Sequence, residues 1–146
     1  MSNQVAGMIL GGFIPAILLG VFALFQKLSV TLGAQPGPYL LFVGVGVITV
    51  AGVLMLFGSR GSLPLPAMGA SLATGLIWAI AVTLIAVAQG RFGASVARLV
   101  PLFNMNTLVA VLLGFLVFAE WQGVRVPRLS LGAVLIVVGG TLVATA

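Results

Sequence analysis

Four polar side chains within the stretch SVARLVPLFNMNTL could bind a solute in otherwise apolar surroundings. They are one arginine, Arg98, two asparagines, Asn104 and Asn106, and one threonine, Thr107. Amide and hydroxyl groups recognise solutes through hydrogen bonds, and a guanidinium pairs with carboxylate or phosphate groups. These residue types therefore indicate binding of a small neutral or anionic solute.

The depth of these residues in a membrane follows from the apolar segment that contains them, residues 94–119. Counting back about 20 residues from its end places Arg98 at the edge of the hydrocarbon, where it either reaches the headgroups or faces an internal cavity. On a regular helix Asn104 and Asn106 lie about 200° apart. Only one of them can then line a given cavity, and the other is expected to bond to a neighbouring helix. Thr107 shares a face with Asn104.

A fifth candidate binding residue is Trp78, which lies in the middle of the apolar stretch TGLIWAIAVTL. Tryptophan usually prefers the membrane interface, so a deep one needs either an acceptor for its indole N–H or a cavity. Two interpretations remain open at this point. Trp78 either lines a binding cavity or packs in a core with its N–H bonded to a neighbouring carbonyl.

The composition indicates an integral membrane protein. Of the 146 residues, 62% are hydrophobic and 5% are charged, whereas about a quarter of the residues of a soluble domain are charged. The net charge of +5 does not indicate a nucleic-acid partner, because no run of basic residues could track phosphates. Basic residues that flank apolar spans normally lie among lipid headgroups, so membrane lipids are the expected partners.

The residue inventory excludes most catalytic chemistry. The chain has no cysteine and no histidine, and its one acidic residue is Glu120. Disulfides, zinc sites, imidazole acid–base chemistry and paired-carboxylate chemistry are therefore excluded within one chain. Because no nucleophile–base pair or metal cluster can be assembled, we expect no enzyme activity, no cofactor and no metal.

Five apolar segments qualify, or nearly qualify, as membrane spans, at about residues 6–26, 38–57, 67–89, 94–119 and 130–146. The runs are continuous rather than alternating, which favours helices over the strands of a barrel. The sequence therefore predicts an all-α integral membrane protein with five transmembrane helices in a single transmembrane domain. The first segment is interpreted as a retained helix rather than a signal peptide, because no basic residue precedes Lys27.

The basic residues do not choose an orientation for these five spans. Three lie on the side of the N-terminus and three on the other side, namely Arg60, Arg125 and Arg128 against Lys27, Arg91 and Arg98. Either partners or insertion order set the topology, or the chain inserts both ways and pairs as an antiparallel homodimer. We favour the second alternative, since many secondary transporters are built from inverted repeats.

Small residues recur at four-residue spacing in the predicted helices. The pairs are Gly7/Gly11, Ala16/Gly20, Gly69/Ala73, Gly75/Ala79 and Gly140/Ala144. Such pairs allow two helix backbones to approach closely. They are expected either to pack helices within the chain or to form the face of a dimer.

The last two segments, GASVARLVPLFNMNTLVAVLLGFLVFAEW and LSLGAVLIVVGGTLV, resemble the end of an EamA-like unit of the drug/metabolite transporter superfamily. The shared features are Pro101, which should bend the fourth helix, the step Ala119–Glu120 at its end, and the glycines of the last helix. This resemblance implies a five-helix unit that dimerises into a ten-helix transporter. The third segment is also similar, more distantly, to the third helix of small multidrug resistance proteins, although the first segment lacks their acidic residue.

These features predict a transporter that moves a small neutral or anionic metabolite by alternating access, as a homodimer in the inner (cytoplasmic) membrane. Its expected substrate-binding residues are Trp78, Asn104, Asn106, Arg98 and Thr107. Two alternatives stand beside this prediction. The chain could be a non-transporting subunit of a larger membrane complex, or a flippase for a lipid-linked carrier.

Overall fold

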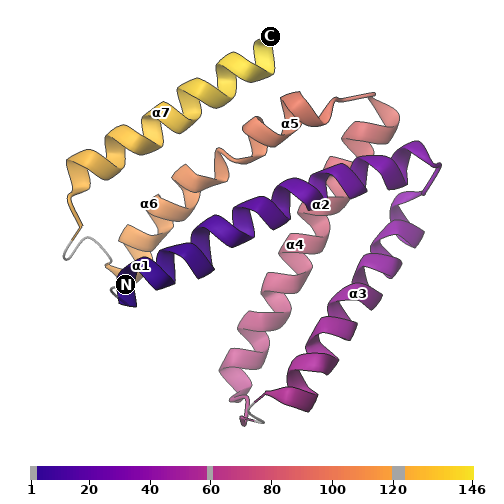
Figure 1. Cartoon of the computed structure of the whole chain (residues 1–146), viewed down its shortest axis with the longest axis horizontal. Helices are drawn as coiled ribbons and strands as arrows, with labels where there is room; N and C mark the ends of the chain where they lie inside the picture. Colours follow the sequence, from indigo (N-terminus) through magenta and orange to yellow (C-terminus); the bar gives the residue numbers. More distant parts are fainter. Residues whose placement is uncertain (1–2, 59–60, 120–123) are drawn as a thin grey trace. The chain divides into compact units, whose positions relative to one another are not determined.

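The computed structural model describes residues 3–58, 61–119 and 124–146, and every regular element among them is a helix (Figure 1). Five segments are long and apolar enough to cross a membrane, namely Val5–Thr31, Pro36–Phe57, Leu65–Arg91, Val96–Phe118 and Val126–Thr145. This confirms the predicted all-α class and the predicted number of spans, as in a multi-pass membrane protein. The chain divides into two compact units, Met1–Gly93 and Ala94–Ala146. That they form a single transmembrane domain stays a prediction.

The first span contains a wider turn within one continuous helical segment. Helix α1 (Asn3–Met8), the π-helix η1 (Ile9–Phe13) and helix α2 (Ile14–Thr31) follow one another without a loop. Pro15 has no N–H group, and its ring would collide in a regular helix with the carbonyl of Gly11, four residues earlier. A π-turn directly before the proline is one of the adjustments that accommodate such a residue.

Helix α2 continues beyond its predicted end and closes in a glycine turn. Gly33 has a φ of +93°, a left-handed conformation that glycine adopts without steric cost. The N–H of Ala34 donates to the carbonyl of Ser29 at 3.1 Å, as in the common C-terminal motif of helices. Helix α3 (Pro36–Phe57) begins directly afterwards with proline in its first turn.

The first unit has a small core at one end of three helices. Helix α4 (Leu65–Arg91) packs against both α2 and α3, while α2 and α3 diverge from their connecting turn (Figure 1). The buried residues of the core are Tyr39, Val82 and Ala86, and four half-buried side chains pack against them: Phe22, Val30, Ala34 and Val43. Most other large apolar side chains of the unit are exposed, which suits helices surrounded by hydrocarbon.

The second unit consists of helices α5 (Val96–Phe103), α6 (Asn106–Phe118) and α7 (Val126–Thr145). Helices α5 and α7 approach closely at Gly140, where an added Cβ would lie 2.8 Å from the carbonyl oxygen of Pro101. Pro101 and Gly140 both belong to the features on which the family resemblance rests. Their contact supplies a packing reason for a residue without a side chain at position 140.

The structure interrupts the helix that the sequence predicts over residues 94–119. Asn104 and Met105 form a turn between α5 and α6. The N–H groups of Met105, Thr107 and Leu108 each donate to the carbonyl three residues earlier, at 3.0–3.1 Å, which is tighter than α-helical bonding. Pro101 was expected to bend this helix, and the interruption follows it by three residues. The hydroxyl of Thr107 donates to the Asn104 carbonyl at 2.8 Å, so it helps to satisfy the backbone at the break.

Helix α6 ends at Ala119, whose φ of +53° is left-handed. This conformation costs a residue with a Cβ about 1–2 kcal/mol, and glycine adopts it freely. Glycine at this position would avoid that cost, and alanine has the smallest side chain that bears it. Glu120, the second residue of the step, lies outside the described residues.

Replacing Gly140 by alanine should destabilise the second unit, because the new Cβ would lie 2.8 Å from the Pro101 carbonyl oxygen. Overpacking of this kind costs about 1–3 kcal/mol. Gly139→Ala is the matched control, since a Cβ at that position meets nothing within 4 Å. Thermal unfolding in detergent should occur at a lower temperature for Gly140→Ala alone. Equal unfolding temperatures for the two variants would contradict the close approach of α5 and α7.

Candidate functional site

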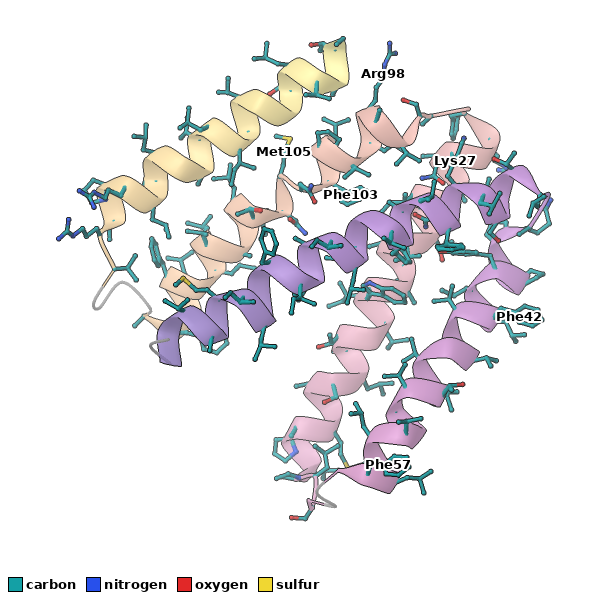
Figure 2. All side chains as sticks on the ribbon, viewed as in Figure 1. Lys27, Phe42, Phe57, Arg98, Phe103 and Met105 are labelled. Atoms are coloured by element: carbon teal, nitrogen blue, oxygen red, sulfur yellow. The ribbon has the colours of Figure 1, made fainter. Side chains whose placement is uncertain are left out.

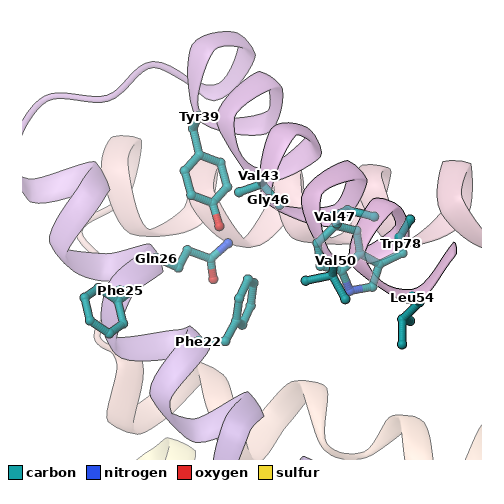
Figure 3. Close-up of a pocket in the computed structure, with 11 residues that line it drawn as sticks. Phe22, Phe25, Gln26, Tyr39, Val43, Gly46, Val47, Val50, Leu54 and Trp78 are labelled. Carbon is teal, nitrogen blue, oxygen red and sulfur yellow. The ribbon is translucent and has the colours of Figure 1, made fainter. Parts of the chain in front are cut away.

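The first unit contains an open groove between α2, α3 and the middle of α4 (Figure 3). Its volume is about 720 Å³, which is within the range of about 300–1,000 Å³ found for small-molecule sites. The lining residues are Phe22, Phe25 and Gln26 from α2, Tyr39, Val43, Gly46, Val47, Val50, Ala51 and Leu54 from α3, and Trp78 from α4. None of these lining residues carries a charge.

One face of α3 forms the long side of the groove. From Val43 onward its lining residues recur at intervals of three and four, which places them along one face of a helix. Gly46 and Ala51 on this face leave space that larger side chains would fill. The sequence did not single out this face, because α3 is apolar all around and shows no periodic change in hydropathy.

The Gln26 amide closes one end of the groove. Its Nε2 donates to the backbone carbonyl of Val82 in α4 at 3.1 Å, and its side chain is also hydrogen-bonded to the Tyr39 hydroxyl of α3. Gln26 is only 2% exposed. One side chain therefore connects three helices, and a bond of this kind between membrane helices contributes about 0.6–2 kcal/mol.

Trp78 lies at the groove and packs against Phe22. The two ring centroids are 6.1 Å apart with an interplanar angle of 46°, a tilted aromatic pair. Trp78 is 39% exposed, and among the described residues no acceptor takes up its indole N–H. This geometry favours the cavity-lining interpretation of Trp78 over a core tryptophan bonded to a carbonyl.

A second pair of polar side chains lies near the same end of the first unit. Lys27 Nζ donates to the backbone carbonyl of Gln89 at 3.5 Å, close to the C-terminus of α4, where a cation is favourable. Gln89 itself is 3% exposed, and no donor among the described residues reaches its buried Oε1. The C-terminal ends of α2 and α4 lie together, so Gln26, Lys27 and Gln89 are at the same end of the first unit.

The other four predicted binding residues belong to the second unit. Arg98 lies in the first turn of α5, where its N–H is 3.4 Å from the Ser95 hydroxyl oxygen that caps the helix. Its side chain is exposed and extends away from α5 (Figure 2). Asn104 and Asn106 are exposed on either side of Met105. Because the helix is interrupted there, the 200° separation expected of a regular helix does not apply to them.

The predicted binding residues belong to both units. Thr107 meets the backbone of Asn104 within the second unit, whereas Trp78 lies in the first unit with Gln26 and Tyr39. A single site composed of all five predicted residues stays a prediction.

Sequence reasoning missed Gln26 and Tyr39. In the sequence Gln26 marks only the end of the first predicted span, and Tyr39 lies within the second. A signal was nevertheless present, because the end of the first span and the start of the second lie on the same side of the membrane. Polar side chains at these two positions are therefore close in depth, and a hydrogen bond between them could have been anticipated.

A scan against models of known protein families finds no match, and comparisons with curated proteins and with solved structures find none either. The family resemblance therefore rests on the residues of the last two helices.

Gln26 and Gln89 are both buried glutamines, but replacing each by methionine should have different effects on the stability of the first unit. Gln26→Met should destabilise the first unit by about 0.5–1.5 kcal/mol, because it removes the bond to the Val82 carbonyl. Gln89→Met should be neutral or stabilising, because it removes a buried acceptor that has no donor among the described residues. Thermal unfolding of both variants in detergent measures the difference. Equal destabilisation by the two substitutions would show that Gln26 contributes only packing.

Proposed function

We propose that this chain is a transporter subunit of the drug/metabolite type and that two copies form an antiparallel homodimer. In this proposal the groove of the first unit receives the cargo and alternating access carries it across the membrane. The cargo is a small metabolite, and the lining favours a neutral over an anionic one. An unpaired charge inside the hydrocarbon is expensive, and the groove offers no charged side chain to pair with it.

The observation that carries the proposal is the position of Trp78 within an otherwise apolar groove. Trp78 lies near the middle of α4 (Leu65–Arg91), so the groove reaches the depth at which secondary transporters hold their substrates. The bonds of Gln26 close the groove on one side of the membrane, and the divergence of α2 from α3 leaves it open on the other. A groove closed at one end is the arrangement expected of one state of an alternating-access cycle.

Two features support the antiparallel homodimer. Lys and Arg are evenly divided between the two sides of the membrane, which gives neither orientation an advantage. In addition, a Cβ at Gly7, Gly11, Gly69 or Gly75 would meet nothing within 4 Å. These glycines do not pack helices against one another within the first unit, so their small faces are open to a partner helix.

The open flank of the groove favours a flippase for a lipid-linked carrier as a second candidate. An apolar groove with an open side could admit a lipid chain while the headgroup crosses the membrane. Flipping and solute transport are distinguished in liposomes by following the headgroup of a labelled lipid and the release of a trapped solute separately.

Trp78→Ala should lower the transport of a responsive solute by at least about tenfold, which corresponds to about 1.4 kcal/mol of lost interaction. Ile77→Ala is the matched control, because Ile77 is 68% exposed and does not line the groove. The measurement is uptake into liposomes that contain the purified protein, across a panel of neutral and anionic metabolites. Failure of the unsubstituted dimer across a broad panel, or equal loss in both variants, would overturn the proposal.

A reporter attached to the C-terminus should be found on both sides of the membrane in comparable amounts. Adding one lysine should shift this balance, with Ser62→Lys and Gln35→Lys acting in opposite directions because they lie in loops on opposite sides. The assay compares a reporter active only in the cytoplasm with one active only outside it. A reporter confined to one side in the unsubstituted chain would rule out dual topology.

A further inference from the structure

The orientation of the Gln26 amide in the groove is determined by its partner in α4. The Val82 carbonyl can only accept a hydrogen bond, so the nitrogen of the amide must face it, as the 3.1 Å distance from Nε2 shows. A flipped amide would place two oxygens against each other. The Tyr39 hydroxyl lies on the same side of the amide as the nitrogen (Figure 3).

This arrangement leaves Gln26 Oε1 as an acceptor without a partner. In Figure 3 the oxygen points away from Tyr39 and toward the space beside Phe22 and Phe25. No donor among the described residues bonds to it, and, unlike the enclosed Oε1 of Gln89, this oxygen is accessible from the groove that Gln26 lines. An acceptor that faces an apolar groove in hydrocarbon has no water to bond to, so a ligand that donates an O–H or N–H to this oxygen would gain affinity.

The remainder of the lining restricts the charge of such a ligand. No acidic or basic side chain lines the groove. Phe22, Trp78 and Tyr39 could attract a cation through their ring faces, but a cation would have no counter-ion there. A carboxylate would meet the Gln26 oxygen as one acceptor facing another. An uncharged hydroxyl satisfies the oxygen without either penalty.

The length of the apolar face restricts the shape of the ligand. The lining residues of α3 extend from Val43 to Leu54, which is eleven residues at about 1.5 Å each, or about 16 Å. Along this length the face offers only apolar atoms apart from the helix backbone. A compact polar solute would leave most of it uncovered, whereas a linear hydrocarbon body would cover it.

We propose that the groove binds an uncharged long-chain alcohol, whose hydroxyl donates to Gln26 Oε1 and whose hydrocarbon chain lies along α3 beside Trp78. The proposal rests on the function proposed above, for which it names the class of cargo. It also assigns Gln26 as the residue that selects a neutral hydroxyl over a charged headgroup.

Trp78 serves as the reporter for a direct binding test. The chain has two tryptophans, so the full-length Trp121→Phe variant retains Trp78 alone. The purified protein in detergent micelles is titrated with three probes of equal chain length, 11-bromoundecanol, 11-bromoundecanoate and 11-bromoundecyl-trimethylammonium. Bromine quenches tryptophan at short range. The alcohol should quench Trp78 saturably, at a concentration at least about tenfold lower than either charged probe.

Two pairs of variants separate binding from folding. Gln26→Leu should abolish the preference for the alcohol, while Gln89→Leu, which changes a buried glutamine outside the groove, should retain it. Because Gln26→Leu removes a bond between helices, a second pair leaves Gln26 in place. Val50→Phe should weaken all three probes by filling the groove, and Val53→Phe, at a position 49% exposed and outside the lining, should not.

Quenching that does not saturate, equal affinity for the three probes, or tighter binding of a charged probe would overturn the proposal. So would a preference for the alcohol that survives Gln26→Leu in a folded protein. Transport in liposomes is scored separately. Transport of another solute without binding of the alcohol would contradict only this inference. Binding of the alcohol without transport of any solute would contradict the proposed function, while the inferred binding site would stand.

Discussion

The side-chain amide of Gln26 joins α2 to α4 through the Val82 carbonyl and to α3 through the Tyr39 hydroxyl. In hydrocarbon a buried amide cannot turn to water for its hydrogen bonds, so these partners hold the three helices together at this level. Away from Gln26, α2 diverges from α3, whereas α3 and α4 stay side by side (Figure 1). The groove lies between helices that hydrogen bonds join at one end only. Gln26 closes that end and is the main polar group of the lining.

Elsewhere the fold is shaped by places where a backbone departs from a regular helix. Pro15 is preceded by a π-turn in the first span. Pro101 lies three residues before the break at Asn104, and its carbonyl is the group against which Gly140 packs. In both spans the membrane requires that displaced backbone groups find new partners nearby. The hydroxyl of Thr107, one of the predicted binding residues, bonds the backbone at the break.

The groove lies in the first unit, whereas most of the predicted binding residues belong to the second. Polarity along the sequence drew attention to the fourth span, where Arg98, Asn104 and Asn106 stand out against apolar neighbours. The described cavity lies in the first unit, and Trp78 is the one predicted binding residue that lines it. An apolar, uncharged lining suits a neutral amphipathic ligand more closely than an anion.

The sequence by itself determined the helical class, the number of membrane spans and a composition unlike that of a soluble domain. These follow from hydropathy over consecutive residues, because in lipid only a helix satisfies its own backbone along an uninterrupted apolar run. It could not show which face of α3 lines a groove, since that helix is apolar on every side. Only the tertiary structure decided that Gln26 meets Val82, 56 residues away, and that Gly140 meets Pro101. Such contacts depend on how helices rotate and approach one another, and small residues and single hydrogen bonds decide this without leaving a periodic pattern in the chain.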